Sequence, residues 1–113
     1  MADSSEALAV VLVTTANDAE GAAIARSLVD ERLAACVNVV PGVRSVYRWE
    51  GAVHEDAEAL LVVKTRRALV DRVAARVKEL HSYALPETIA LSIVGGAEAY
   101  LAWVREETTP APG

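Results

Sequence analysis

The stretch NVVPGVRSVYRWEGAV at residues 38–53 decides the fold, because two extended segments in it are separated by a Pro-Gly break and followed by a turn. Val and aromatic residues are typical of strands, and Pro41-Gly42 predicts a bend or bulge within one. Glu50-Gly51 predicts the turn of a hairpin. A long, bent hairpin with aromatic residues near its tip offers more strand edge than one small domain can cover. The first functional expectation is therefore self-association.

Residues 8–14, upstream of this hairpin, form a continuous apolar run that is typical of a strand buried on both faces. Asn17 and Glu20 then predict an N-cap and a capping box that open a helix. The apolar positions of this helix follow helical spacing at Ile24, Leu28, Val29 and Leu33. A second apolar run over residues 34–40 leads into the Pro-Gly break.

Downstream of the hairpin, a third strand is expected over residues 52–64, and Thr65 is a candidate cap for a second helix. Residues 81–87 break that helix, residues 88–94 alternate as a fourth strand, and residues 97–104 form a short terminal helix. The second helix carries one apolar stripe, made by Leu69, Val73, Val77 and Leu80.

The element order is β-α-β-β-α-β with one extra C-terminal helix. This order predicts an α+β fold, the ferredoxin-like split sandwich, with the helices on one face of an antiparallel sheet and an extended, bent hairpin between its second and third strands. We expect a single domain over residues 8–107, with flexible tails at residues 1–7 and 108–113. The chain has 113 residues, which is enough for one core without disulfides.

Charge and composition exclude several classes. The net charge of −5 argues against nucleic-acid binding, which requires a basic face. No apolar run is long enough to cross a bilayer, and the N-terminal residues lack the pattern of a signal peptide, so a cytoplasmic location without membrane association is expected. The single cysteine, Cys36, excludes an internal disulfide and is expected to be a buried, small apolar residue.

Two histidines are the candidate metal ligands. His81 follows the second helix, where it is either a cation that interacts with the helix C-terminus or an imidazole ligand in a binding cleft. His54 lies beside Glu55, Asp56 and Glu58, and this group is either a cation site or a solvated acidic edge that deters strand pairing. Alternation along a strand divides the group between two faces, which favours the acidic edge.

No enzyme motif is present: the chain has no GxSxG, P-loop or GxGxxG, and no nucleophile and base at an interpretable spacing. A non-enzymatic protein is therefore expected. Tyr47, Arg48 and Trp49 are suited to stacking on a ligand, and they are also residue types that association interfaces prefer. Without a basic patch, the interface is the favoured interpretation.

Several motifs follow one another along nearly the whole chain. They are AACVNVVPGVRSVYRWEG at residues 34–51, KTR at 64–66, HSY at 81–83 with PE at 86–87, and YLAW at 100–103. Together they closely resemble the CutA family, the divalent-cation tolerance proteins. The resemblance covers residues 8 to about 106 with every element in order, so it is more specific than any single short pattern.

The resemblance implies a homotrimer in which the bent hairpins pair across subunits, through Pro41, Gly42, Val46, Tyr47 and Trp49. It implies a non-enzymatic role linked to copper and other divalent cations, with Cu(II) or another divalent ion as the bound ligand and no organic cofactor. Metal ligands would be His81 and Glu87. The alternative is a signalling or scaffolding trimer that holds a small molecule or a partner protein in inter-subunit clefts, lined by Tyr47, Trp49, Lys64, Tyr83 and Glu87.

Two positions depart from the family pattern. Some metal-binding members have a cysteine at the end of the first strand and two adjacent histidines after the second helix. Thr14 and Leu80 occupy the corresponding positions here, and only His81 remains. Because Cu(I) favours sulfur ligands, this chain is not expected to contain a thiolate Cu(I) site.

Overall fold

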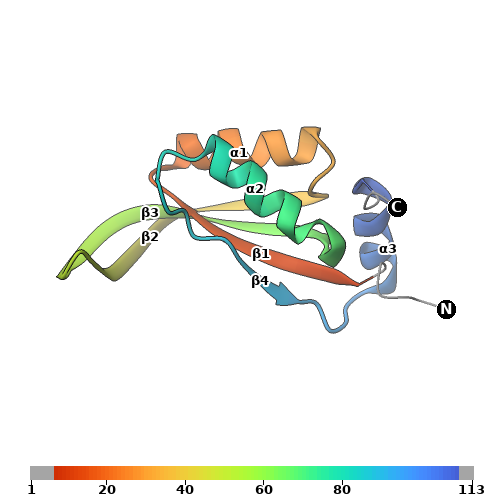
Figure 1. The fold of residues 1–113 in the computed structure, drawn as a ribbon. Coiled ribbons are helices and arrows are strands. Elements are labelled where there is room, and N and C mark those ends of the chain that lie inside the picture. Colours follow the sequence, from red (N-terminus) through yellow and green to blue (C-terminus); the bar gives the residue numbers. More distant parts are fainter. Residues whose placement is uncertain (1–6, 110–113) are drawn as a thin grey trace.

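The computed structural model describes residues 7–109 (Figure 1). The expected element order is confirmed. The elements are β1 (Leu8–Thr15), α1 (Asp18–Asp30), β2 (Cys36–Trp49), β3 (Ala52–Arg66), the 3-10 helix η2 (Arg67–Leu69), α2 (Val70–Leu80), β4 (Ile89–Ser92) and α3 (Glu98–Glu107).

The four strands form one antiparallel sheet in the order β2-β3-β1-β4. Helices α1 and α2 lie side by side over one face of this sheet, and α3 lies at the end where β1 begins (Figure 1). This arrangement confirms the ferredoxin-like α+β fold, because both βαβ crossovers return to the same side of the sheet.

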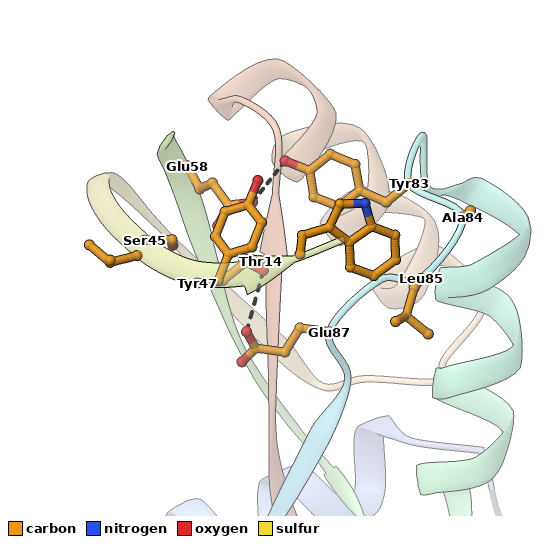
Figure 2. Close-up of a pocket in the computed structure, with 10 residues that line it drawn as sticks. Thr14, Ser45, Tyr47, Glu58, Tyr83, Ala84, Leu85 and Glu87 are labelled. Atoms are coloured by element: carbon orange, nitrogen blue, oxygen red, sulfur yellow. Dashed lines mark hydrogen bonds between the residues drawn. The ribbon is translucent and has the colours of Figure 1, made fainter. Parts of the chain in front are cut away.

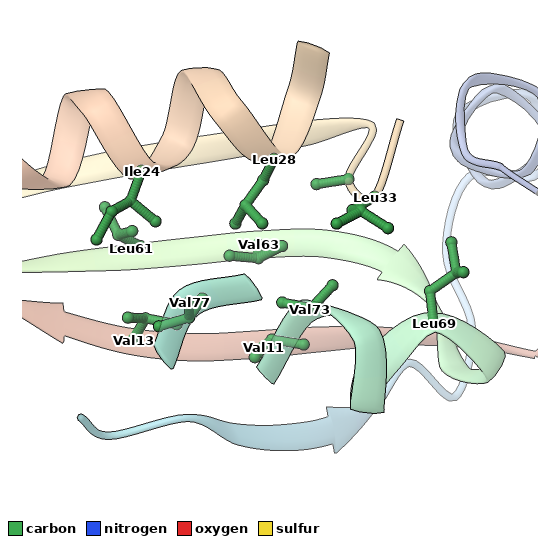
Figure 3. Close-up of a cluster of buried hydrophobic side chains, with 11 residues drawn as sticks. Val11, Val13, Ile24, Leu28, Leu33, Leu61, Val63, Leu69, Val73 and Val77 are labelled. Atoms are coloured by element: carbon green, nitrogen blue, oxygen red, sulfur yellow. The ribbon is translucent and has the colours of Figure 1, made fainter. Parts of the chain in front are cut away.

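The main core lies between the sheet and the two helices (Figure 3). Strand side chains alternate between faces, so every second residue of β1 and β3 points toward the helices. These positions are fully buried at Val11, Val13, Leu61 and Val63, where they contact Ile24, Leu28, Val73 and Val77 of the helices.

The opposite face of the sheet is covered only in part. Val104 of α3 packs against Leu8 and Ala35 at one end of it. By the pairing register, Leu12 and Val10 face the same side as their β4 partners Ile89 and Leu91. Ile89 and Leu91 are 51% and 54% exposed. An apolar part of the sheet is therefore left uncovered by residues 7–109.

The β2–β3 hairpin has the predicted bend and turn. Its register shifts between Val40 and Val43, where Gly42 has φ +73°. The tip is formed by Glu50 and Gly51, both with positive φ, as a two-residue turn of type I′ requires. Because β1 pairs with β3 only as far as Ala59, the hairpin beyond that residue projects from the body of the molecule (Figure 1).

The expected helix caps are confirmed only in part. The Asn17 side chain accepts a hydrogen bond from the Glu20 amide at 2.8 Å, as predicted, but the Glu20 carboxylate accepts from Ala16 instead of completing a capping box at Asn17. The predicted cap at Thr65 is wrong. Thr65 is buried within β3, which continues to Arg66, and its hydroxyl donates to the Leu33 carbonyl oxygen at 2.6 Å.

The ends of the domain differ slightly from expectation. The fourth strand is confirmed but shorter, covering Ile89–Ser92. Most of the two predicted tails lies outside the described residues. Where they are described, they contact the body: Ala7 accepts from the Arg67 amide, Thr108 is buried, and Thr109 donates to the Arg32 carbonyl oxygen at 2.7 Å. The proposed domain limits remain a prediction.

Candidate functional site: a cavity at the base of the hairpin

A cavity of about 550 Å³ lies where the projecting hairpin leaves the sheet (Figure 2). Its walls come from the far half of β2, the end of β1, the middle of β3, and the segment that follows α2. Ten residues line it: Thr14, Ser45, Val46, Tyr47, Trp49, Glu58, Tyr83, Ala84, Leu85 and Glu87.

Hydrogen bonds connect the two walls of this cavity (Figure 2). The Tyr83 hydroxyl donates to Glu58 at 2.7 Å, and Glu58 is only 9% exposed. Glu87 Oε1 accepts a longer contact of 3.4 Å from the Thr14 hydroxyl. Burial raises the pKa of the Tyr83 phenol, and its bond to Glu58 raises it further. Tyr83 therefore keeps its proton at neutral pH and donates its hydrogen bond to Glu58.

Tyr47 has a similar arrangement on the hairpin wall. Its hydroxyl donates to Asp56 on the neighbouring strand, and this bond raises the pKa of the phenol. The His54 ring stacks on the Tyr47 ring, with centroids 5.5 Å apart and planes 19° apart. Both phenols that line the cavity are thus paired with carboxylates.

The segment after α2 is held by Glu20 and His81. Glu20 accepts hydrogen bonds from the Ala16 amide at 3.0 Å and the Ser82 amide at 2.8 Å. The His81 side chain is completely buried, and its Nδ1 accepts from the Tyr83 amide at 3.1 Å. Its Nε2 lies 2.7 Å from the Thr14 carbonyl oxygen, so this nitrogen carries the proton and donates it there.

The predicted metal ligands occupy different surroundings. Both ring nitrogens of His81 already have partners, whereas Glu87 is exposed and lines the cavity. Thr14 lines the same cavity, and Leu80 packs against the core. Within residues 7–109, no three His, Cys, Asp or Glu side chains gather in a group that could hold a metal ion. The metal role of His81 and Glu87 remains a prediction.

Four of the five predicted cleft residues line this cavity: Tyr47, Trp49, Tyr83 and Glu87. Lys64 does not. It lies nearer the opposite end of β3, where it pairs in register with Cys36 and donates to the Asn38 side chain. The binding role of this set is still a prediction, but Lys64 contributes nothing to the cavity within a single chain.

Sequence reasoning missed Glu58 as part of the site. It grouped Glu58 with the solvated acidic edge, and Glu55 does lie on that edge, paired with Arg44 at 3.0 Å. Glu58 differs because it is the residue before Ala59, at which β1 pairing ends, so it lies under Tyr83. Strand alternation places Glu58 on the same face of the hairpin as Tyr47. This pattern could have identified Glu58 as a cavity residue from the sequence.

The expected burial of Cys36 is wrong. Its side chain is only partly buried on the less covered face of the sheet, and its Sγ lies 3.9 Å from Lys64 Nζ. Burial raises the pKa of the Tyr100 phenol, and its interaction with Cys36 raises it further. Cys36 therefore lies beside Tyr100 of α3, and it does not line the cavity.

The fold and the cavity define a small α+β protein with a ferredoxin-like sheet, a projecting hairpin and an acidic, aromatic-walled cavity at its base. Residues 9–107 match the model of the CutA1 divalent ion tolerance protein family, and this chain belongs to that family. The resemblance derived from the motifs is thereby confirmed.

Relatives from a bacterium and from plants support this assignment. The divalent-cation tolerance protein CutA of Thermus thermophilus is 52% identical over 99 residues, which are 88% of this chain and 96% of the relative. The chloroplastic CutA of Arabidopsis thaliana is 50% identical over 88% of this chain, but this chain spans only 54% of it. The crystal structure of CutA1 from Oryza sativa superposes with a TM-score of 0.92 at 47% identity, covering 96% of this chain and 100% of that one.

The cytoplasmic location expected from the sequence remains a prediction. None of the helices in residues 7–109 has both the length and the apolar character needed to span a membrane.

Proposed function

We propose that this chain is a non-enzymatic homotrimeric protein that binds divalent cations and contributes to tolerance of them. The observation that supports the assembly most strongly is a pair of apolar surfaces that the described part of the chain leaves exposed. The first surface is on the sheet, at Val40, Ile89 and Leu91. The second is on the projecting hairpin, where Val46 is 64% and Val53 is 62% exposed.

These two surfaces differ in shape, which bears on the kind of assembly. A twofold dimer joins identical patches, whereas a cyclic ring joins one surface to a different surface on the next subunit. A projecting hairpin and an open sheet face are two such different surfaces on one chain. Contiguous apolar area of this kind marks association sites. The number of subunits, three, comes from the family resemblance.

Light scattering tests the assembly. The unmodified protein should have three times the mass of one chain, and Val46→Asp should reduce that mass, because a charge cannot be buried cheaply in an apolar interface. Trp49→Ala should weaken the trimer by a smaller amount. Val29→Asp is the matched control, since Val29 is 41% exposed on α1, away from both surfaces. An unchanged trimer in Val46→Asp would contradict the proposal.

We place the cation at Glu87 and His81. Imidazole and carboxylate are suitable ligands for Cu(II) and Zn(II). Because His81 Nε2 is bound to the Thr14 carbonyl oxygen and Nδ1 to the Tyr83 amide, a metal bond requires one of these hydrogen bonds to break. Metal binding should therefore rearrange the backbone at Thr14 or Tyr83.

Calorimetry with Cu(II) and Zn(II) tests this site. His81→Ala and Glu87→Gln should each weaken binding by about tenfold or more, the loss expected for a metal ligand or its close partner. His54→Ala is the control, because His54 is exposed on the hairpin and stacks on Tyr47. Amide NMR signals of residues 14 and 83 should shift on metal addition. Absence of binding at micromolar concentrations and neutral pH would refute the metal role for this chain.

A second candidate function is supported by the cavity itself. Under this alternative the trimer is a signalling or scaffolding protein that holds a small molecule or a partner segment beside the hairpin. Four predicted cleft residues line one cavity of about 550 Å³, within the size range of small-molecule sites. A thermal-shift screen separates the candidates, because only a ligand that binds the native state raises the melting temperature. Stabilisation by organic compounds but not by metals would favour the second function.

A further inference from the structure

The cavity at the base of the hairpin has aromatic side chains on several sides. Tyr47 comes from the far half of β2 and Tyr83 from the segment after α2 (Figure 2). Trp49, also from the far half of β2, lines the cavity too. Leu85 adds an aliphatic side chain. The electron-rich faces of tyrosine and tryptophan rings attract cations, and the attraction is greatest for tryptophan. Three such residues around one cavity therefore favour a cationic ligand.

The charges around the cavity have one sign. Glu58 and Glu87 line it, and Asp56 accepts the hydrogen bond of Tyr47 just outside it. None of the ten lining residues is a lysine or an arginine. An anionic ligand would therefore meet carboxylates without a compensating cation, which is unfavourable in a partly enclosed site.

The hydrogen bonds of the two phenols strengthen this preference. Tyr47 donates to Asp56 and Tyr83 donates to Glu58. A phenol that donates to a carboxylate keeps its proton directed at that group, and its ring becomes richer in electrons. The hydroxyl protons are thus directed at carboxylates, so they are not free to bind an anion.

A bare metal ion fits these walls less well than an organic cation. The carboxylates at the cavity belong to no group of three potential ligands within the described residues. A volume of about 550 Å³ with aromatic walls also exceeds what one metal ion occupies.

We propose that this cavity binds a small organic cation, an ammonium compound with a hydrocarbon body. The nitrogen lies against the rings of Tyr47 and Trp49 and near Glu87, and the hydrocarbon part contacts Leu85 and Val46. This proposal rests on the second candidate function, in which the cavity holds a small molecule, and it defines the chemical class of that molecule.

Three probes of similar size and different charge test the proposal. Tetramethylammonium is the cation, tert-butanol the neutral compound and pivalate the anion. Binding is followed by NMR through the indole N–H signals of Trp49 and Trp103, assigned with Trp103→Phe. Trp103 lies on α3 and does not line the cavity, so its signal is an internal control. The dissociation constant obtained from the shift of the Trp49 signal should be at least tenfold lower for tetramethylammonium than for tert-butanol. Pivalate should not bind.

Variants locate the site. Tyr47→Leu removes a ring and Glu87→Gln removes a charge, so each should weaken tetramethylammonium binding by about threefold to tenfold. Tyr47→Phe keeps the ring and should retain binding within about twofold. Glu55→Gln is the charge control, because Glu55 pairs with Arg44 and does not line the cavity. Equal binding of the cation and tert-butanol, or no shift of the Trp49 signal, would overturn the proposal.

Light scattering of the same samples separates failure of the organic-cation proposal from failure of the proposed trimer. If the protein is trimeric and binds Cu(II) but not tetramethylammonium, the organic-cation proposal fails and the metal-binding trimer stands. If tetramethylammonium binds as expected to a protein that is not trimeric, the cation class stands and the trimer fails.

Discussion

The two halves of the β2–β3 hairpin belong to the same strands in the same antiparallel pairing, yet their surroundings differ. In the near half, Leu61 and Val63 are completely buried under α1 and α2. In the far half, Val46 and Val53 are more than 60% exposed, and none of the helices within residues 7–109 covers them. The register shift between Val40 and Val43 separates the two halves.

This difference shows that apolar strand residues serve two purposes in one hairpin. The near half contributes to folding of the single chain, because its side chains leave water when the helices pack on it. The far half has equally strand-favouring residues but contributes little to that core. Its apolar side chains stabilise the protein only when another surface covers them, which is the physical basis of the proposed assembly.

The largest expected effect compares two identical substitutions on β3. Val63→Ala should lower the free energy of unfolding by about 2–3 kcal/mol, because it removes buried methyl groups and leaves a cavity. Val53→Ala should change it by less than about 0.5 kcal/mol in the single chain, while weakening assembly. Urea denaturation at one fixed protein concentration measures the first quantity, and light scattering on dilution measures the second. Equal destabilisation would show that the two halves are not distinct.

The second prediction concerns the boundary between the halves. Gly42→Ala should destabilise the protein by about 1–2 kcal/mol, since φ +73° is strained for a residue with a Cβ atom. A Cβ at Gly42 would meet no atom within 4 Å, so the loss of stability would report backbone strain and not a steric clash. Gly95→Ala is the matched control, because its Cβ would also meet open space and its φ is not positive. Thermal unfolding of both variants decides the matter. Identical melting temperatures would argue that the bend tolerates any residue.

The smallest expected effect lies at Glu20, which holds the cavity segment against α1. Glu20→Gln should destabilise the protein by about 1 kcal/mol, because the amide retains one acceptor oxygen of two. Burial alone raises the pKa of the Glu20 carboxyl, but the hydrogen bonds from Ser82 and Ala16 and the nearby His81 together lower it below its ordinary value of 4.5. The charged form therefore stabilises the fold above pH 4.5, and this stabilisation is lost as the pH falls through the lowered pKa.

Melting temperatures between pH 3 and pH 7 test this linkage. The unmodified protein should lose stability below pH 4.5 more steeply than Glu20→Gln, which has no carboxyl to titrate at this position. Asp30→Asn is the control, since Asp30 is exposed at the last residue of α1. Parallel curves for Glu20→Gln and the unmodified protein would contradict the assigned role of Glu20.

Features set by neighbouring residues could be predicted from the sequence. Pro41-Gly42 and Glu50-Gly51 determine the bulge and the turn through their own backbone preferences, so both predictions are confirmed. Asn17 also acts locally, on the amide three residues ahead. The element order then follows from apolar periodicity, and the topology follows from crossover handedness.

Features that depend on distant contacts were predicted poorly. Thr65 resembles a helix cap in sequence, but its hydroxyl binds the Leu33 carbonyl oxygen, 32 positions away. Glu58 resembles its exposed neighbours until Tyr83 folds over it. Lys64 was grouped with the cleft, although it lies toward the end of β3 that is remote from the hairpin tip and does not line the cavity as Glu58 does. These assignments depend on how far each strand extends, which local patterns determine only to within a few residues.

The position of α3 has a practical consequence. Leu8 and Val104 pack together at the end of the sheet where β1 begins, and the Thr109 amide binds Arg32 at the same end. The hairpin tip lies at the other end of a molecule 49 Å long (Figure 1). A label, linker or extra domain joined to either end of the domain would therefore be attached far from the tip. The domain is thus suited to immobilisation or fusion at the end that carries Leu8 and Val104, which leaves the hairpin tip accessible.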